Sequence, residues 1–504
     1  MSKRQQFLRK STIFTFLSMA FFAALLGAGR FAAVNLGEPQ AAEAAVKQSA
    51  LGSGTLFMPY LADNSAPLLC RFGVNVSGNL ASTDLAPLRS GWYVDYQALA
   101  NPLRPGGAEY MPIIDLSQLG VSGYEYEPNG AVLEAVVANN PGAGWLIGNE
   151  PDRQQFQNDM EPEVYADAYH ELYYLIKGLD PTARIIAGTI VQPTDIRLDY
   201  LDLVLSAYQA DYGESMPVDG WSAHNFILNE VNEERCSPEE LPAWVWEVGC
   251  WGAGVPPGEE FENVLFGEVV PIDENDSMDY FRERVVRFRQ WMKDNGYRNV
   301  PLLISEYGIL MPQDFGFPSW RVNQFMNSTF TYMLNTTDPN LGLPQDENRL
   351  VQQFSWYSTT DNGFNGWLFN PQSFGLTDMG WNYRQYTSLI AEKIDLFPMD
   401  LTMQVNGPNV TLAARIANSG NLAMKTAADV VFYDGNPSSG GQQIGSVQFL
   451  SVRGCGNSGT VSINWPNPSA GSHNVYVRVK NAGFRDETNA GNNQMMKTFV
   501  VPSR

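Results

Sequence analysis

The chain has 504 residues, of which 44% are hydrophobic and 12% aromatic, a composition typical of a globular protein. It carries 54 acidic against 32 basic side chains, giving a formal net charge of −22. Because phosphate binding needs clustered Lys and Arg, this charge argues against nucleic acid as a partner. The length allows two or three domains.

The first 45 residues have the pattern of an export signal. A basic start that includes Lys3, Arg4, Arg9 and Lys10 precedes an apolar run at residues 12–29, and Ala-rich positions follow at 41–45. We expect residues 1–45 to be a cleaved signal peptide, with an uncleaved N-terminal anchor as the alternative. The protein is then secreted or held at the cell surface, with membrane contact through this segment only. Residues 46–64 are interpreted as a linker.

Four cysteines suit an exported protein with few disulfides. Cys236 and Cys250 are close in one predicted loop, and we expect them to pair. Cys70 and Cys455 are expected to be unpaired, because they belong to different predicted domains. The chain has three histidines and no Cys/His cluster with metal-ligand spacing, so neither a metal nor another cofactor is predicted.

Strands and helices alternate through residues 65–395, which is typical of a parallel α/β fold. The predicted strands are 68–76, 90–96, 109–115, 144–150, 184–191, 218–225, 300–308 and 353–358. The predicted helices are 131–138, 162–177, 200–212, one beginning after Ser277, 321–334 and 383–394. Eight strands predict a (β/α)₈ TIM barrel. The first three strands follow one another too closely for ordinary helices between them, so those connections are expected to be short or irregular.

A long insertion, residues 227–275, follows the sixth predicted strand and is rich in Glu, Pro, Gly and Trp. Loops of this length inside a compact domain are usually functional. Because the insertion leaves the carboxyl end of a strand, we expect it to overhang the mouth of the barrel. Surface elaboration without a function is the alternative.

After about residue 395 the helical periodicity stops and seven short strands follow, separated mostly by Asn-, Gly- and Ser-rich turns. They are predicted at 401–405, 410–416, 429–433, 445–450, 459–465, 473–479 and 496–501. This pattern predicts a β-sandwich over residues 396–504. Asn418-Ser419-Gly420, the run 430–437, Glu487-Thr488-Asn489 and Asn492-Asn493 resemble a CARDB-type immunoglobulin-like domain. The resemblance implies an accessory role in adhesion, spacing or carbohydrate contact.

Two apolar strands end in a glutamate. One reads Asn149-Glu150-Pro151 at its end, and the other reads Ser305-Glu306-Tyr307-Gly308. The carboxyl ends of parallel barrel strands carry the chemistry, so two carboxylates there could face each other as glycosidic bond cleavage requires. Pro151 is expected to push Glu150 into an extended conformation. Helix capping or pairing with Arg is the alternative role of the two glutamates.

The two motifs together resemble clan A of the retaining glycoside hydrolases over roughly residues 65–395. The resemblance implies that Glu306 is the nucleophile and Glu150 the acid/base. Such a pair needs about 5–5.5 Å between its carboxyl groups. Glu306 is expected to stay ionised, whereas Glu150 is expected to have a raised pKa.

Further substrate-binding residues are predicted around this pair. Asn149 is placed to bind the sugar 2-hydroxyl, with a turn role as the alternative, and His224 to orient the nucleophile or bind sugar. Trp356 resembles the sugar-platform tryptophan of the clan, with core packing as the alternative. The clan often supplies an aromatic hydroxyl near the sixth strand, and Phe226 has no hydroxyl. Many members also use an Arg at the end of an early strand, whereas Arg71 lies near the start of its predicted strand. The remaining candidates are Tyr307, Trp221, Trp367 and Trp251.

The sequence therefore predicts an exported retaining glycoside hydrolase that cleaves a β-linked glycan by double displacement. Its expected partner is a polysaccharide or oligosaccharide. A neutral glycan suits the acidic surface, whereas an acidic one would need local Arg residues. The alternatives are a barrel that binds polysaccharide without cutting it, with the tail as an adhesion module, and a transglycosylase. The sequence leaves the sugar, the linkage and endo or exo action open.

Overall fold

The computed structural model describes residues 68–503 except 79, 81–82, 422–423, 425, 481–486 and 488. The predicted export segment and linker, residues 1–64, lie outside the described residues. Among the helices of the described part, none combines the length and apolar character that a membrane span requires.

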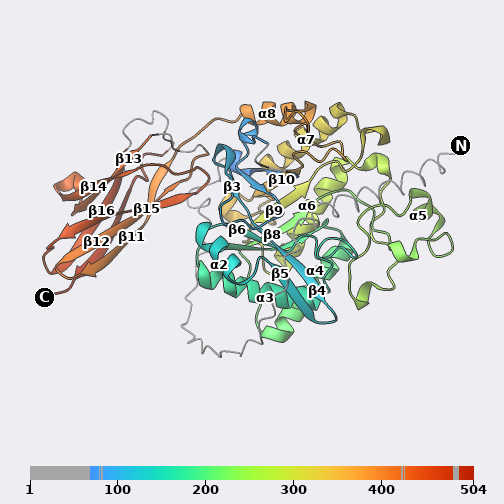
Figure 1. Ribbon diagram of the computed structural model, residues 1–504, viewed down its shortest axis with the longest axis horizontal. Coiled ribbons are helices and arrows are strands. Elements are labelled where there is room, and N and C mark those ends of the chain that lie inside the picture. Colours follow the sequence, from blue (N-terminus) through green and yellow to red (C-terminus); the bar gives the residue numbers. More distant parts are fainter. Residues whose placement is uncertain are drawn as a thin grey trace. The chain divides into compact units, whose positions relative to one another are not determined.

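The N-terminal part of the described chain is a mixed α/β fold around one curled sheet of ten strands (Figure 1). The strand order is β3-β2-β1-β10-β9-β8-β7-β6-β4-β5. Neighbours are parallel except in the β4–β5 hairpin, which the sequence did not predict. The bounds are β1 Phe72–Asn75, β2 Trp92–Val94, β3 Glu109–Tyr110, β4 Ile113–Leu119, β5 Gly123–Glu127, β6 Gly144–Ile147, β7 Arg184–Ile190, β8 Gly220–His224, β9 Leu302–Tyr307 and β10 Gln353–Tyr357.

β3 at one end of this strand order and β4 near the other end follow each other closely in the sequence. Only Met111 and Pro112 separate β3, which pairs with β2, from β4, which pairs with β6. Pro112 has no N–H to donate, yet its carbonyl accepts from the Leu146 amide at 3.0 Å. The predicted third strand is therefore two short strands, and the complete eight-stranded barrel stays a prediction.

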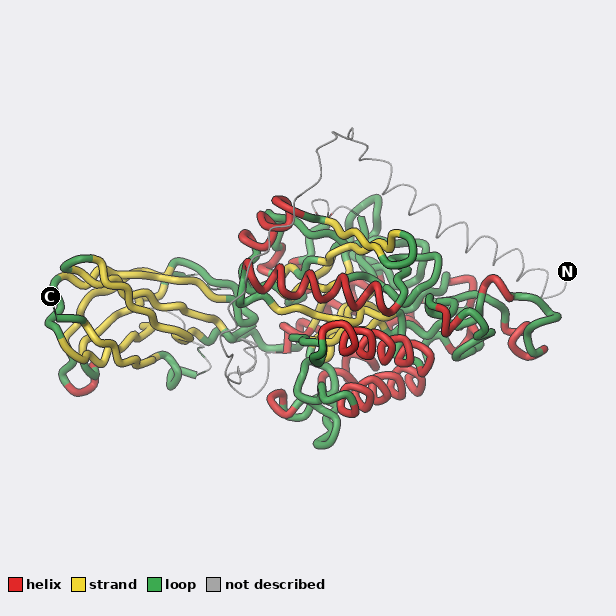
Figure 2. The backbone as a smooth tube through the Cα atoms, turned by 90° about the horizontal axis from the view of Figure 1, so that it is seen from below, coloured by secondary structure: helices red, strands yellow, loops and turns green. Residues whose placement is uncertain are grey.

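Helices flank the strands, as the red coils beside the yellow strands show in Figure 2. Pro162 begins α3, and Val164, Ala168 and Leu172 on one face of that helix are buried as predicted. The last helix begins earlier than predicted, because the Thr377 side chain caps it by accepting from the Gly380 amide. The bounds are α2 Gly130–Asn139, α3 Pro162–Leu179, α4 Asp195–Tyr212, α5 Ala243–Val248, α6 Met278–Asp294, α7 Ser319–Asn335 and α8 Asp378–Ser388.

Side-chain alternation along β8, β9 and β10 decides which residues face the interior of the sheet. Small polar groups face inward, where the Ser222 hydroxyl donates to Ser305 Oγ at 2.6 Å. The intervening aromatic residues point outward to the helices, as Trp221 does against Trp291 of α6. His224, two residues after Ser222, lies on the same inward face. Glu306 directly follows Ser305 and also reaches this face, because the pairing of β9 with β8 and β10 shifts register here.

Buried polar residues hold the two ends of the insertion after β8 together. Asn229 accepts from the Val270 amide at 2.6 Å, and the buried carboxylate of Glu230 accepts from the Glu268 amide at 2.8 Å. The predicted disulfide between Cys236 and Cys250 is confirmed.

The seven C-terminal strands form two antiparallel sheets, β11-β12-β15 and β14-β13-β16-β17, with a common apolar core. All seven strands occur where the sequence predicts them. The bounds are β11 Leu396–Asn406, β12 Asn409–Asn418, β13 Ala428–Asp434, β14 Gln442–Phe449, β15 Ser458–Pro466, β16 Gly471–Lys480 and β17 Gln494–Val501.

The prediction that Cys70 and Cys455 are unpaired was wrong. They form a disulfide across a sequence separation of 385, with their Cα atoms 5.4 Å apart. Cys70 lies in a turn of 3₁₀ helix, Leu68–Arg71, where the sequence predicted the start of a strand. No local pattern reveals such a pair, because the two cysteines are far apart in the sequence.

Candidate active site

The structure brings Glu150 and Glu306 together. Glu150 follows β6 and Glu306 belongs to β9, so both stand at strand carboxyl ends. One oxygen of each carboxylate and one ring nitrogen of His224 all lie within 4.8 Å of one another. Glu150 is 3% and Glu306 8% exposed, so both carboxylates are largely withdrawn from water.

The backbone of Glu150 is left-handed, with φ +47°, which corrects the expected extended conformation. The Glu150 amide donates to the Thr189 carbonyl at 3.0 Å, which ties the turn to β7. Two residues on, the buried Asp152 carboxylate pairs with Arg197 at 2.7 Å. A non-glycine residue in this region costs of order 1–3 kcal/mol, so these surrounding contacts hold the turn against its own preference.

His224 lies between the two glutamates. Its Nδ1 is 2.9 Å from Glu150 Oε1, and its Nε2 is 3.8 Å from Glu306 Oε2. Burial opposes a charge on the ring, but the facing Glu306 and Glu150 outweigh it and raise the pKa of His224. The imidazole is therefore placed to hold a proton between the carboxylates.

Two further side chains make the environments of the glutamates different. The Tyr96 hydroxyl donates to Glu306 Oε2 at 2.7 Å. On the other side, Arg153 Nη1 pairs with Glu150 Oε2 at 3.0 Å, and the Arg153 side chain is 20% exposed. Glu306 thus accepts from a neutral donor, whereas Glu150 is bound to a fixed positive charge.

The pKa values of the pair are ordered opposite to the expectation. Burial alone would raise the pKa of Glu150, but Arg153 and His224 outweigh it and lower the pKa to about 2. Burial raises the pKa of Glu306 to about 7, with Glu150 adding to the rise and His224 opposing it. The expected raised pKa is on Glu306, so the resting pair carries its proton there.

Glu150, His224 and Glu306 also form a group that could be considered as metal ligands. Their ligand atoms spread over up to 4.8 Å, whereas Zn–ligand bonds of about 2.0–2.2 Å require closer spacing. Both ring nitrogens of His224 already face carboxylates. This arrangement fits proton sharing better than metal coordination.

Two other predicted residues lie in or beside strand-end loops. Asn149 is 7% exposed, and its side-chain amide donates to Gln157 Oε1 at 3.1 Å. Trp367 is half-buried in the segment after β10, where its carbonyl accepts from the Thr377 hydroxyl. Both remain candidates for substrate contact.

The structure removes Trp356, Tyr307 and Trp221 from the predicted substrate contacts. All three rings are fully buried on the helix side of the sheet. Trp356 packs against Tyr307, with ring centroids 5.4 Å apart, and its N–H donates to Gly366 O at 2.7 Å. Core packing, the alternative for Trp356, is what the structure shows, because strand alternation turns each of these rings outward.

Sequence reasoning missed three residues at the site. Tyr96 supplies the aromatic hydroxyl that the sixth strand lacks, and it comes instead from the end of the second. Tyr357, next to Trp356, turns inward, and burial raises its pKa, with the charges of Asp361, Glu306 and Glu150 adding to the rise. The signal for Tyr357 was strand alternation, and Arg153 was detectable as a cation three residues after Glu150. Arg71, by contrast, is buried against Asp346 before β1 and takes no part.

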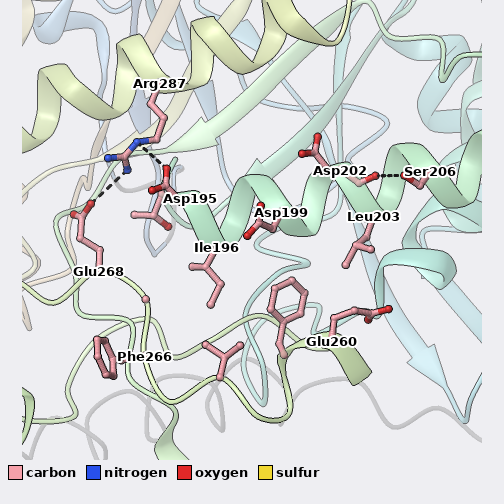
Figure 3. Close-up of a pocket in the computed structure, with 14 residues that line it drawn as sticks. Asp195, Ile196, Asp199, Asp202, Leu203, Ser206, Glu260, Phe266, Glu268 and Arg287 are labelled. Carbon is pink, nitrogen blue, oxygen red and sulfur yellow. Dashed lines mark hydrogen bonds and ion pairs between the residues drawn. The ribbon is translucent and has the colours of Figure 1, made fainter. Parts of the chain in front are cut away.

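A pocket of about 770 Å³ lies elsewhere, between α4 and the insertion (Figure 3). Its lining includes several carboxylates, and Arg287 joins Asp195 to Glu268 across one end. None of the predicted site residues lines it. Its contacts attach the insertion to α4 and do not extend the active site.

Solved structures similar to this chain have low identity to it. An endo-beta-1,3-glucanase of GH128 subgroup II from Sorangium cellulosum is 15% identical (TM-score 0.37), covering 62% of this chain and 98% of that one. A GH128 subgroup VII oligosaccharide-binding protein from Trichoderma gamsii is 12% identical (TM-score 0.37), covering 63% and 94%. A glucosidase from Croceicoccus marinus is 12% identical (TM-score 0.38), covering 81% and 95%.

At these identities and TM-scores, the similarities assign neither an activity nor a site to this chain. No curated protein matches it. A family model does match its C-terminal part. Residues 395–497, which include β11 to β16 and the first half of β17, match the CARDB family.

Proposed function

We propose that the chain is a retaining glycoside hydrolase of clan A type, built on a complete (β/α)₈ barrel, which cleaves β-linked glycans. The observation that carries the proposal is the pair of buried carboxylates at strand ends, with facing oxygens within 4.8 Å. This spacing is near the roughly 5–5.5 Å of retaining enzymes and well below the 6.5–9.5 Å that leaves room for water in inverting ones.

In the proposed reaction, the Glu306 carboxylate attacks the anomeric carbon and Glu150 gives its proton to the leaving oxygen. A glycosyl–Glu306 ester forms as the glycosidic bond breaks. Glu150 then takes a proton from water, whose oxygen attacks the anomeric carbon and releases Glu306. The Tyr96 hydroxyl stabilises the carboxylate that leaves, and Asn149 binds the sugar 2-hydroxyl.

The resting proton has to move before this reaction can begin. The resting pair holds it on Glu306, because Arg153 stabilises the ionised form of Glu150. If substrate draws Arg153 away, burial dominates at Glu150 and raises its proton affinity. The proton then passes to Glu150, and His224, which faces both carboxylates, is the group between them.

We also propose that the protein acts outside the cytoplasm. The C-terminal domain is then an accessory module that binds glycan or brings the enzyme to it. Two disulfides suit an oxidising compartment. The match of residues 395–497 to the CARDB family agrees with an accessory role.

The test is release of reducing ends from a panel of β-glucans, mannans and xylans. We expect cleavage of at least one, and loss of about 10³-fold or more in kcat for Glu306→Gln. The matched control is Glu134→Gln, which replaces an exposed carboxylate on α2 by a carboxamide and should keep full activity. Glycan binding without cleavage would contradict the proposal and favour a binding protein. Transfer to an added sugar acceptor that outpaces hydrolysis would favour a transglycosylase.

A further inference from the structure

Two buried N–H groups, one three residues after Glu150 and one in the insertion after β8, have no acceptor among the described residues. They are Arg153 Nε and Trp251 Nε1. Trp251 is 9% exposed and belongs to the insertion. Leaving a buried donor unpaired costs roughly 1–3 kcal/mol, so each of these groups calls for an explanation.

The two residues are held close to the catalytic turn. Arg153 Nη1 pairs with Glu150, and its Nη2 lies 3.5 Å from the carbonyl of Gly252, which follows Trp251. Arg197, which holds Asp152, also donates to the Ala253 carbonyl at 3.0 Å. The segment with Trp251 is therefore attached to the same turn that carries Glu150.

The insertion holds this segment rigidly. Cys250 is fixed by its disulfide to Cys236. Gly252 has φ +132°, and a Cβ there would lie 2.2 Å from the Asn229 carbonyl oxygen, so only glycine fits. Trp251 lies between these two fixed residues, so little conformational entropy remains for its backbone to lose on binding.

We infer that Arg153 and Trp251 form a sugar-binding subsite beside Glu150, in which both N–H groups donate to oxygens of the glycan unit next to the bond that is cleaved. This inference rests on the proposed function. Both groups are donors only, so the ligand supplies acceptors, which the hydroxyl and ring oxygens of a neutral sugar do. Arg153 then divides its hydrogen bonds between the glycan and Glu150, which links binding to the state of the acid/base.

The chain offers a matched control for the tryptophan. Trp145 of β6 is also fully buried with an N–H that has no acceptor among the described residues. It lies within a strand rather than in the insertion. Trp145→Phe removes the same atom without touching the subsite, so it reports the effect of an unpaired indole N–H alone.

The experiment measures kcat and KM on the glycan that the wild type cleaves. Trp251→Phe keeps a ring and removes the N–H, and Arg153→Lys keeps a charge and removes Nε. We expect KM to rise about three- to tenfold in each, with kcat for Trp251→Phe within about twofold of wild type and KM unchanged in Trp145→Phe. Unchanged KM in both subsite variants, or an equal rise in Trp145→Phe, overturns the inference.

A binding measurement separates this inference from the proposed function. Calorimetric titration of the same glycan into Glu306→Gln, with and without Trp251→Phe, reports affinity without turnover. If the wild type cleaves nothing, the hydrolase proposal fails, and the subsite is judged by whether Trp251→Phe weakens binding to the glycan of highest affinity. Equal affinities overturn the subsite. Arg153→Lys carries the test if Trp251→Phe does not fold.

Discussion

The Tyr96 hydroxyl donates to Glu306 Oε2 at 2.7 Å, although Tyr96 follows β2 and Glu306 lies near the end of β9. This hydrogen bond lowers the pKa of Glu306 against the larger effect of burial, which raises it. It also stabilises the carboxylate that the proposed reaction uses as nucleophile and leaving group. The contact therefore acts on both the proton and the chemistry of the site.

Tyr96→Phe should lower kcat/KM by about tenfold to a hundredfold, because a hydrogen bond to a charged group contributes about 1.5–3 kcal/mol. It should also raise the pKa of Glu306, so the alkaline limb of the pH profile moves to higher pH. Tyr126→Phe, which removes a hydroxyl bound to the exposed Glu171, is the control. A Tyr96→Phe enzyme with unchanged rate and unchanged profile would contradict the role given to this contact.

The pH dependence of kcat/KM should show a loss of activity above pH about 7. The active free enzyme holds one proton on the coupled pair, and the raised pKa of Glu306, about 7, marks where that proton is lost. The low-pH limb should lie near the pKa of Glu150, about 2. Rates measured from pH 4 to pH 9 check the expected loss of activity above pH about 7, and an activity that keeps rising from pH 7 to pH 9 would refute it.

Glu306→Gln should stabilise the protein at alkaline pH. Because the folded pKa of Glu306 is raised from 4.5 to about 7, its favourable contribution is complete below pH about 4.5 and is lost as pH rises through about 7. Glutamine cannot ionise, so the variant avoids that loss. We expect its free energy of unfolding to exceed that of the wild type by about 1–3 kcal/mol at pH 8 and by little at pH 4.

Denaturant unfolding at the two pH values measures this difference, with Glu134→Gln as the control that should stay within about 0.5 kcal/mol. A Glu306→Gln variant that is less stable than the wild type at pH 8 would mean that the buried carboxylate is better satisfied than its surroundings indicate.

The disulfide between Cys70 and Cys455 should hold the two parts of the chain together after a cut between α8 and β11. Leu389, 83% exposed, offers a chymotryptic site in this connection. The cut protein should run as one band on a denaturing gel without reductant and as two bands with it. In Cys455→Ser the fragments should separate without reductant. Two bands from the cut wild type before reduction would show that the disulfide is absent.

Much of the fold follows from local sequence signals. Apolar runs ending in polar residues located the strands that carry Glu150, His224 and Glu306, and turn residues located all seven strands of the sandwich. These signals are short in range and need no knowledge of the partner strand. The β4–β5 hairpin was missed because the predicted third strand stops at residue 115 and no strand was predicted between there and the helix at 131–138.

The predictions that failed concern features that depend on which way a side chain points or on contacts with residues far away in the sequence. Trp356 and Tyr357 are neighbours, yet only one faces the interior, and which one depends on the register of β10. The left-handed backbone of Glu150 follows from contacts with Thr189 and from Arg197 on Asp152, which no local pattern contains. The reversed pKa order follows from the pairing of Arg153 with Glu150, and that pairing depends on the left-handed turn as well as on the spacing of the two residues.

The proposal depends on which glutamate carries the sugar between the two steps, and azide rescue measures this directly. With an activated aryl β-glycoside of the sugar that the enzyme cleaves, azide should restore both alanine variants. Glu150→Ala should release the β-glycosyl azide, because the ester on Glu306 still forms, and Glu306→Ala should release the α-glycosyl azide by direct attack. The opposite assignment of the two anomers by NMR, or no rescue of either variant, would contradict the account.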